Sequence, residues 1–486
     1  MPVLPRLCLS AFVLAATACP ALAAPGEVLA TRENRVESHG TALSVTTEAG
    51  LVGIESSPGH VDGSAGYISY VAKDDGADRP VLFIFNGGPG ASSSFLHMGA
   101  LAPVRAEVPQ DPQTPLPAQA KITANNNTLL DLADLVFIDP PGTGFSNIAD
   151  NADRDFYMST HGDAEAASQL VTQWLADHDR KNAPIYILGE SYGTIRATEM
   201  VATLHEMDAP ARLQGVILLG QALNMIETSQ RPDNIVTYPV SLPSQAAIAC
   251  YHGVITQPCK PEEIAQEVSD FAEEYLHALY QGRDVPTAEK RAVAEKLAEF
   301  TGISADYFLT HDLRISKERF RVALLQDRGL VTGRYDARYT ERLPDDAGLL
   351  YGPDPFSAVS NLYGEAMKRY LANDLGLPNT ADYKVLNQME GSWSYGSGDS
   401  PFNDWPFMTI IEDAMERNPD LRLFVGSGMY DLTTTIGAAD YLIAQSDIAQ
   451  DRYSLNVYPA GHVAYSDDVS WAKLMVDLRR FISQDN

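Results

Sequence analysis

Short runs of apolar, β-branched and aromatic residues alternate with amphipathic segments through the first half of the chain. Strands are predicted at 67–72, 81–85, 135–138, 185–188 and 216–219. Several of these runs are apolar on both faces, which is typical of strands inside a covered parallel sheet. Between them, residues 164–176 and 194–206 have helical patterns. This alternation predicts a doubly wound α/β fold with right-handed crossovers.

The pattern changes after about residue 226 and later returns. Polar amphipathic helices are predicted at 261–282, 287–302, 314–327 and 357–375. Alternating helices and strands resume at 409–417, 421–425, 436–444, 454–458 and 468–482. We therefore predict one sheet domain interrupted by a mainly helical cap. Its first part would span 24–227, the cap 228–405 and its second part 406–486.

Residues 1–23 have the pattern of a secretory signal peptide. Arg6 precedes an apolar stretch at 7–18, and Ala21-Leu22-Ala23 forms a small-x-small cleavage site. An uncleaved anchor is disfavoured because the stretch is shorter than the roughly 20 residues that span a bilayer. A lipidated Cys19 is disfavoured because the three residues before it are a poor lipoprotein box. The sequence predicts a secreted or periplasmic protein.

Composition and charge narrow the classes of partner. The 486 residues are 45% hydrophobic and carry 35 Lys and Arg against 64 Asp and Glu, for a net charge of −29. The apolar fraction is that of a folded globular protein. An acidic excess repels phosphate backbones and anionic lipids, so we predict no nucleic-acid binding and no membrane binding after signal cleavage. The sequence gives no oligomeric state.

The four cysteines reduce to one predicted disulfide. Cys8 and Cys19 would leave with the signal peptide, and the remaining Cys250 and Cys259 would pair in an oxidising compartment. Two free thiols are the alternative. Two cysteines with only His252 nearby are too few ligands for zinc, so no metal site and no cofactor are predicted.

The candidate nucleophile follows the predicted strand 185–188. There Gly189-Glu190-Ser191-Tyr192-Gly193 leads into a predicted helix. A G-x-S-x-G turn between a strand and a helix projects the serine hydroxyl above the sheet, and its glycines relieve crowding. Ser191 is the candidate nucleophile, against the alternative of a purely structural turn.

The base and the acid should follow the serine along the chain, in the order acid and then histidine. Among the histidines after Ser191, only His462 follows a strand of the resumed sheet. Asp431 follows the strand 421–425 and the turn Gly426-Ser427-Gly428, which favours it as the acid. Asp467 and Asp468 suit the start of the last helix instead, because carboxylates stabilise helix N-termini.

An early glycine-rich loop is the candidate oxyanion site. After the strand 81–85 come Asn86-Gly87-Gly88-Pro89-Gly90, whose glycines let backbone N–H groups approach an anion. Tyr192 would supply the second N–H, as the residue after the nucleophile. A phosphate loop is the alternative, but neither a G-K-[ST] ending nor a G-x-G-x-x-G pattern is present.

Together these motifs resemble the serine carboxypeptidases, secreted enzymes of the α/β-hydrolase fold. The resemblance rests on Gly66-Tyr67, the 86–90 loop, Pro103-Val104-Arg105, the segment Asp139-Pro140-Pro141-Gly142-Thr143-Gly144-Phe145-Ser146, the 189–193 turn, Asp431 and Gly461-His462. It implies that Ser191, His462 and Asp431 form the triad, with Gly88 and Tyr192 as oxyanion donors. It also implies that Asn86, Gly87 and Glu190 bind substrate, with Asn86 and Glu190 near its terminal carboxylate, and that a helical cap covers the site.

Three positions depart from the family pattern. Where the family has a Trp, a Cys and a second Glu, this chain has Ile84, Ala91 and, if aligned without gaps, Ala100. The second Glu pairs with the Glu before the nucleophile, and a lone ionised Glu190 would repel a substrate carboxylate. We therefore predict activity less confined to acidic pH than in typical relatives.

The leading hypothesis is an exported serine carboxypeptidase that acts on peptides through an acyl-enzyme. An esterase or acyltransferase with the same triad and an ester substrate is the first alternative. A noncatalytic binding protein on a hydrolase scaffold is the second.

Overall fold

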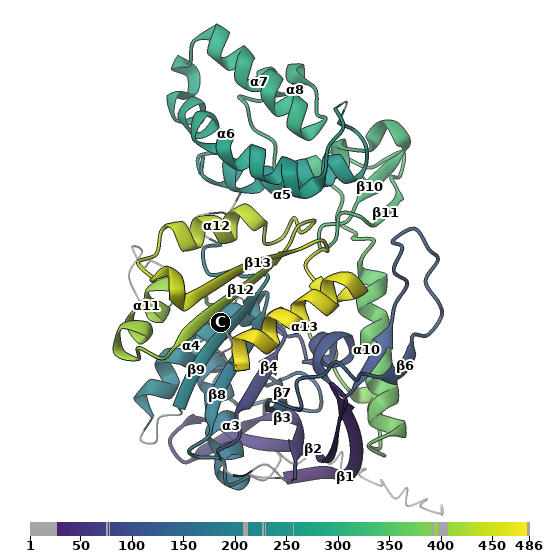
Figure 1. The fold of residues 1–486 in the computed structure, drawn as a ribbon, viewed down its shortest axis with the longest axis vertical. Helices are drawn as coiled ribbons and strands as arrows, with labels where there is room; N and C mark the ends of the chain where they lie inside the picture. Colours follow the sequence, from purple (N-terminus) through teal and green to yellow (C-terminus); the bar gives the residue numbers. More distant parts are fainter. Residues whose placement is uncertain are drawn as a thin grey trace, which may run out of the picture.

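The fold is built on one large β-sheet. The computed structural model describes residues 27–73, 76, 78–207, 212–225, 228, 230–255, 257–389, 393–396 and 407–483, so the predicted signal peptide lies outside the described residues. Within these ranges nine strands pair in the order β1-β2-β3-β7-β4-β8-β9-β12-β13 (Figure 1). Their bounds are β1 Glu27–Ser38, β2 Thr41–Ser57, β3 His60–Ala72, β4 Val81–Phe85, β7 Asp134–Asp139, β8 Pro184–Glu190, β9 Arg212–Leu219, β12 Arg422–Gly428 and β13 Tyr453–Tyr458.

The sheet is mostly parallel, as the sequence predicts. Strands β7, β4, β8, β9, β12 and β13 run parallel to one another. Strands β1, β2 and β3 form antiparallel hairpins, and β3 is also antiparallel to β7. The predicted strand 67–72 is therefore the end of a longer antiparallel strand. Short turns join β1 to β2 and β2 to β3, and a parallel crossover needs a dozen or more residues.

Alternating side chains of the central strands build the two faces of the sheet. In β4, Leu82 and Ile84 belong to one core cluster, whereas Val81, Phe83 and Phe85 belong to the other. All five are fully buried. Burial on both faces explains why these runs carry apolar residues without alternation, and why their pattern predicted strands of a covered sheet.

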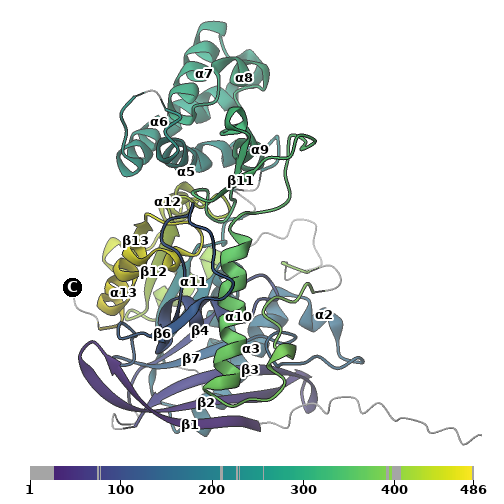
Figure 2. The ribbon, with the colours of Figure 1, turned by 90° about the vertical axis from the view of Figure 1, so that its right-hand side faces the viewer.

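Helices cover each face. One core cluster holds residues of α3, α4, α11 and α12, and the other holds residues of α1, α10 and α13 (Figures 1 and 2). The bounds of these helices are α1 Ser94–Leu96, α3 Thr160–Asp177, α4 Tyr192–Glu206, α10 Ser357–Asn373, α11 Phe407–Arg417, α12 Ile436–Ala444 and α13 Asp468–Ser483. Smaller elements are α2 Arg154–Tyr157, the π-helix η1 His97–Leu101, the strands β5 Val104–Glu107 and β6 Lys121–Ala124, and the 3-10 turns η4 Thr380–Asp382, η5 Gln450–Arg452 and η6 Ala464–Ser466.

A separate helical layer stands above one end of the sheet (Figure 1). It comprises α5 Thr237–Tyr251, α6 Pro261–Gln281, η2 Gly282–Asp284, α7 Thr287–Thr301, α8 Ala305–Thr310, α9 Lys317–Ala323, η3 Gln326–Arg328, β10 Leu330–Thr332 and β11 Thr340–Arg342. These helices share their own hydrophobic cluster. The predicted disulfide is present, since Cys250 at the end of α5 is bonded to Cys259 just before α6.

Helix α10 lies in the predicted cap segment but packs elsewhere. Its residues Tyr363, Met367 and Tyr370 belong to a cluster on the sheet, and the Tyr370 hydroxyl is 2.7 Å from that of Tyr70 in β3. Figure 2 shows α10 running alongside the sheet, below the helical layer. The boundaries predicted for the cap, 228–405, stay a prediction.

Candidate active site

The turn between β8 and α4 holds Ser191 in an unusual backbone conformation. Ser191 has φ 60° and ψ −129°, a left-handed φ that is strained for a residue with a side chain. Backbone hydrogen bonds fix it, from Ser191 N to Leu219 O at 2.8 Å and from Thr194 N to Ser191 O at 2.9 Å. A Cβ on Gly189 would lie 2.1 Å from the Gly193 carbonyl oxygen, so the turn needs glycine there. The geometry is that of a nucleophile elbow.

Asp431 and His462 come together although 31 positions separate them. Asp431 follows β12 and His462 follows β13, and these strands are parallel neighbours, so their carboxyl ends meet. His462 Nδ1 lies 2.6 Å from Asp431 Oδ2. Both side chains are almost fully buried. This contact assigns Nδ1 as the donor and leaves Nε2 free to accept a proton.

Other donors fix the orientation of the Asp431 carboxylate. Thr433 N donates to Oδ1 at 2.6 Å, and Thr434 Oγ1 donates to Oδ2 at 2.6 Å. On the histidine side, His462 N donates to the Tyr335 carbonyl at 2.6 Å. His462 Nε2 is buried with no aligned hydrogen-bond partner in the described chain, and it belongs to a residue that lines the same pocket as Ser191.

The surroundings favour a protonated His462. Burial works to lower its pKa, but the attraction and hydrogen bond of Asp431 outweigh burial, so the pKa of His462 lies above its ordinary value. Glu190 and Asp354 add smaller effects in the same direction. An imidazole that holds a proton well can take one from a nucleophile and keep it while negative charge develops nearby.

The loop after β4 lies directly on the nucleophile turn. A Cβ on Gly87 would lie 2.5 Å from Tyr192 N and 2.6 Å from the Glu190 carbonyl oxygen, so no other residue fits. Gly88 has φ 107°, which also favours glycine. The backbone of the loop thus lies against that of Tyr192, and the prediction that their N–H groups form an oxyanion site stays a prediction.

Asn86 and Glu190 form a polar pair at the inner wall of the pocket. Asn86 Nδ2 donates to Glu190 Oε1 at 2.8 Å, and Leu96 N donates to Asn86 Oδ1 at 3.1 Å. Both side chains are buried. Burial is the largest cause of a raised pKa at Glu190, with His462, Tyr465 and Asn86 opposing it. A carboxyl with a raised pKa can stay neutral beside a bound anion.

A pocket of about 180 Å³ joins these groups. Its polar wall contains Asn86, Glu190, Ser191 and His462. Its other walls include Phe95 and Val463, which are close in sequence to the polar wall, and residues of a separate segment, namely Tyr335, Phe356, Ser357, Ser360, Asn361 and Leu386. Several of these lie within 330–390, where the sequence pattern predicted few elements, so the sequence did not identify the pocket walls.

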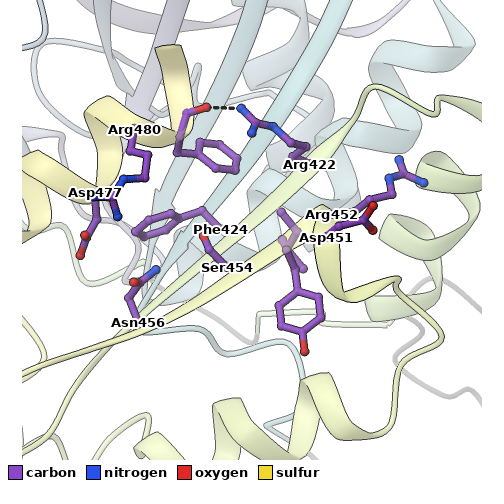
Figure 3. A pocket seen from close by; sticks show the side chains of 11 residues that line it. Arg422, Phe424, Asp451, Arg452, Ser454, Asn456, Asp477 and Arg480 are labelled. Carbon is purple, nitrogen blue, oxygen red and sulfur yellow. Dashed lines mark hydrogen bonds between the residues drawn. The ribbon is translucent and has the colours of Figure 1, made fainter. Parts of the chain in front are cut away.

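A second hollow, drawn in Figure 3, lies at the open edge of the sheet. It measures about 170 Å³ and is lined by residues of β12, β13 and α13, including Arg422, Ser454 and Arg480. None of the predicted site residues lines it. The candidate chemistry therefore belongs to the pocket beside Ser191.

The remaining sequence candidates lie away from Ser191 or have structural roles. His252 Nε2 contacts the Ala337 carbonyl at 2.7 Å within the cap segment. Asp467 accepts from Ser470 N at 2.9 Å, and Asp468 begins α13, as the sequence predicts for these two acids. Among the departures from the family pattern, Ile84 is buried in β4, Ala91 lines the pocket and Ala100 is buried in η1.

Sequence reasoning did not identify Thr434, Tyr335 or Tyr465 as parts of the site. Thr434 lies three positions after the acid, where a threonine can bond to the carboxylate, so that spacing was a usable signal. No pattern pointed to Tyr335, which lies in a segment rich in Gly, Asp and Tyr. Tyr465 follows His462 by three positions, and it interacts with Glu190, but no pattern in the sequence indicates this pairing.

The family model described as serine carboxypeptidase matches residues 39–280, from the first hairpin to α6. The chain belongs to the serine carboxypeptidase family. The matched region contains the 86–90 loop and the Ser191 turn, whereas Asp431 and His462 follow it along the chain.

Two plant proteins and one solved structure extend the comparison. Serine carboxypeptidase-like 34 of Arabidopsis thaliana is 24% identical over 248 residues, 48% of each chain. Serine carboxypeptidase-like 51 of the same plant is 30% identical over 156 residues, 29% of each chain. This family member thus spans at most about half the length of these relatives. The crystal structure of KEX1(delta)p, a prohormone-processing carboxypeptidase from Saccharomyces cerevisiae, has a TM-score of 0.53 at 15% identity and covers 91% of this chain and 92% of its own. That likeness confirms the α/β-hydrolase fold.

Proposed function

We propose that this protein is a serine carboxypeptidase that releases C-terminal residues from peptides through an acyl-enzyme. The observation that carries the proposal is the meeting of Ser191 at its strained turn and the Asp431–His462 pair around one pocket. Membership of the serine carboxypeptidase family supports it.

The proposed reaction uses these groups in order. Ser191 Oγ attacks the scissile carbonyl carbon while His462 Nε2 takes its proton, and the N–H groups of Gly88 and Tyr192 stabilise the oxyanion. His462 then gives the proton to the leaving amine as the C–N bond breaks. A water molecule attacks the acyl-enzyme, again with His462 as the base, and restores Ser191. Asp431 keeps the imidazole oriented throughout.

The polar pair beside the nucleophile would recognise the end of the substrate. Asn86 and Glu190 line the pocket next to Ser191, and we propose that they bind the terminal carboxylate, with Gly87 in contact with the substrate backbone. This would require a neutral Glu190, which its raised pKa favours. An enzyme built this way cuts the last peptide bond of a chain.

The direct test is the variant Ser191→Ala. We expect it to fold like the wild type and to lose turnover by about 10⁴- to 10⁶-fold, by analogy with serine-protease triad knockouts. A fluorophosphonate should add its mass to the wild type and not to the variant. Unchanged peptide turnover in Ser191→Ala, or a wild type that resists the probe, would refute the assignment.

An esterase or acyltransferase is the second candidate. It is favoured by Ala100, which has no carboxyl to pair with Glu190, and by Glu190 Oε2, which has no aligned hydrogen-bond partner in the described chain. An enzyme of this kind would turn over esters without distinguishing peptides with free and amidated C-termini. A strong preference for the free C-terminus would exclude it.

We also propose that the protein is exported after cleavage behind Ala23. The Cys250–Cys259 disulfide supports an oxidising compartment. Among the described residues no helix has the length and apolarity needed to cross a membrane. Sequencing of the mature N-terminus should begin at Ala24, and a mature protein that retains residues 1–23 would contradict the proposal.

A further inference from the structure

One of the two carboxyl oxygens of Glu190 lacks an aligned hydrogen-bond partner among the described residues. The side chain is only 5% exposed. Its Oε1 accepts from Asn86, but Oε2 has no aligned hydrogen-bond partner in the described chain. Buried carboxyl oxygens are nearly always hydrogen-bonded, because an unpaired one is costly. A group that serves Oε2 is therefore to be expected close by.

Tyr465 has a buried hydroxyl that also lacks an aligned hydrogen-bond partner among the described residues. It lies in η6 and is fully buried. Glu190 and Tyr465 interact, since hydrogen bonding from Tyr465 lowers the pKa of Glu190, whereas the charge and hydrogen bonding of Glu190 add to burial in raising the pKa of Tyr465. The two groups that lack a partner therefore lie close enough to act on each other.

The fold makes room for this tyrosine. A Cβ on Gly99, in the π-helix η1, would lie 2.5 Å from Tyr465 Cδ2, so the ring packs directly on the glycine backbone. Ala100, where the family pattern has a second carboxyl, is the next residue of that helix. The hydroxyl of Tyr465 thus offers Glu190 a partner without adding a charge.

The position of Tyr465 decides the kind of role it can have. Glu190 lines the pocket, whereas Tyr465 is buried and is not among the lining residues. It is therefore placed to act on substrate through Glu190. Burial and Glu190 both raise the pKa of Tyr465, so the hydroxyl keeps its proton and remains a donor.

We propose that Tyr465 is a positioning residue, whose hydroxyl donates to Glu190 Oε2 and holds this carboxyl ready to receive the terminal carboxylate of a peptide. With Asn86 on Oε1 and Tyr465 on Oε2, the acid proton of Glu190 is directed into the pocket. The inference rests on the proposed carboxypeptidase function and names what takes over from the missing second carboxyl.

Loss of the Tyr465 hydroxyl should shift the pH dependence of peptide binding in a definite direction. Besides burial, the groups that shift the pKa of Glu190 are His462, Tyr465, Asn86 and Asp431. A hydroxyl that donates to the carboxylate stabilises its ionised form, so removing it raises the pKa of Glu190. Binding of a free carboxylate weakens when Glu190 ionises. The pH profile of kcat/KM for a peptide with a free C-terminus should fall on its alkaline side, and this alkaline limb should move to higher pH when the Tyr465 hydroxyl is lost.

The test compares Tyr465→Phe with Tyr363→Phe, a matched control. Tyr363 is also fully buried, and its hydroxyl also lacks an aligned partner in the described chain. For a peptide with a free C-terminus, at a pH low enough for Glu190 to be neutral in both enzymes, we expect Tyr465→Phe to raise KM about tenfold, because Glu190 loses the hydrogen bond that orients it. We expect kcat to change less than about threefold. A blocked amino acid p-nitrophenyl ester, which has no terminal carboxylate, should be turned over as by wild type, and Tyr363→Phe should leave both substrates unaffected.

Two further variants show whether the effect passes through Glu190. In a Glu190→Gln background, Tyr465→Phe should add nothing, because the group it positions is already changed. A 3-fluorotyrosine at 465 is a stronger donor of nearly the same shape and should move the alkaline limb to lower pH. It also serves if Tyr465→Phe folds poorly.

The outcomes separate this inference from the function on which it rests. Failure of the wild type to release C-terminal residues would overturn both. Release by the wild type would leave the function standing. In that case an unchanged KM and an unmoved limb in Tyr465→Phe and the fluorotyrosine enzyme, or equal losses on peptide and ester, would overturn the role of Tyr465 alone.

Discussion

At the scale of single residues, the site depends on which buried groups hold a proton. Asp431 is surrounded by donors from Thr433 and Thr434 and contacts His462 through its remaining lone pairs. These donors orient the carboxylate, and against the effect of burial its attraction and hydrogen bond raise the pKa of His462. Glu190 stands in the opposite situation, because burial raises its pKa.

These directions predict how activity depends on pH. His462 must be neutral to act as a base, and its pKa is raised, so kcat/KM should be low in acid and should rise through a pKa above the ordinary 6.5. With an ester substrate that has no carboxylate, this rise on the acid side of the profile can be measured without the effect of Glu190. In Asp431→Asn the acid limb of the remaining activity should move to lower pH, because the carboxylate that raises the pKa of His462 is gone. Peptides with a free C-terminus should add an alkaline fall as Glu190 ionises.

A profile of kcat/KM that peaks below about pH 5 would contradict this prediction. An acid limb at the same pH in Asp431→Asn and in wild type would also contradict it.

At the scale of elements, one buried arginine links three parts of the site. Arg196 of α4 donates through Nε to Asp163 of α3 at 2.7 Å and through a terminal nitrogen to the Asn86 carbonyl at 2.8 Å. The Tyr192 hydroxyl donates to the same Asp163 oxygen at 2.9 Å. The arginine is fully buried. It therefore fixes the 86–90 loop against the helix that begins after Ser191.

Arg196→Met should be strongly destabilising. The change leaves Asp163 buried without its cation, which costs about 3–5 kcal/mol when one partner of a buried pair is removed. Urea unfolding should show this loss. The control Arg283→Met removes an arginine whose side chain is 96% exposed, and should change stability by less than about 0.5 kcal/mol. Equal stabilities of the two variants would refute the role of Arg196.

The elements also show what could be predicted from the sequence. Strands such as β4 and β8 were predicted to within two residues at each end, because burial on both faces requires continuous apolar runs. Strands β1 and β2 were missed, since β1 is mostly exposed and reads as polar. Helix α5 was missed because it is buried on nearly all sides and contains Pro243, so it has neither a polar face nor an uninterrupted pattern.

At the scale of the whole molecule, the site is assembled from distant segments around the ends of parallel strands. Ser191 follows β8, Asp431 follows β12 and His462 follows β13. The motifs could be found because each follows a recognisable strand. The pocket walls and Tyr465 could not, because their roles depend on packing between segments that no local pattern connects.

The helical layer reaches the site through the loop after β12. Met429, Tyr430 and Leu432, which flank Asp431, belong to the hydrophobic cluster of this layer. Lys317 Nζ, at the start of α9, donates to the Thr433 carbonyl at 2.9 Å. The layer thus packs on the loop that carries the acid, which supports the proposal that it acts as a cap on a single catalytic unit.

The most direct test of the central claim is mass spectrometry of products from matched peptides that differ only in a free or an amidated C-terminus. The account predicts that wild-type enzyme releases single residues from the C-terminus of the free peptide, that the amidated peptide stays intact, and that Ser191→Ala leaves both intact. Internal cleavage, equal cleavage of both peptides, or release by Ser191→Ala would contradict it.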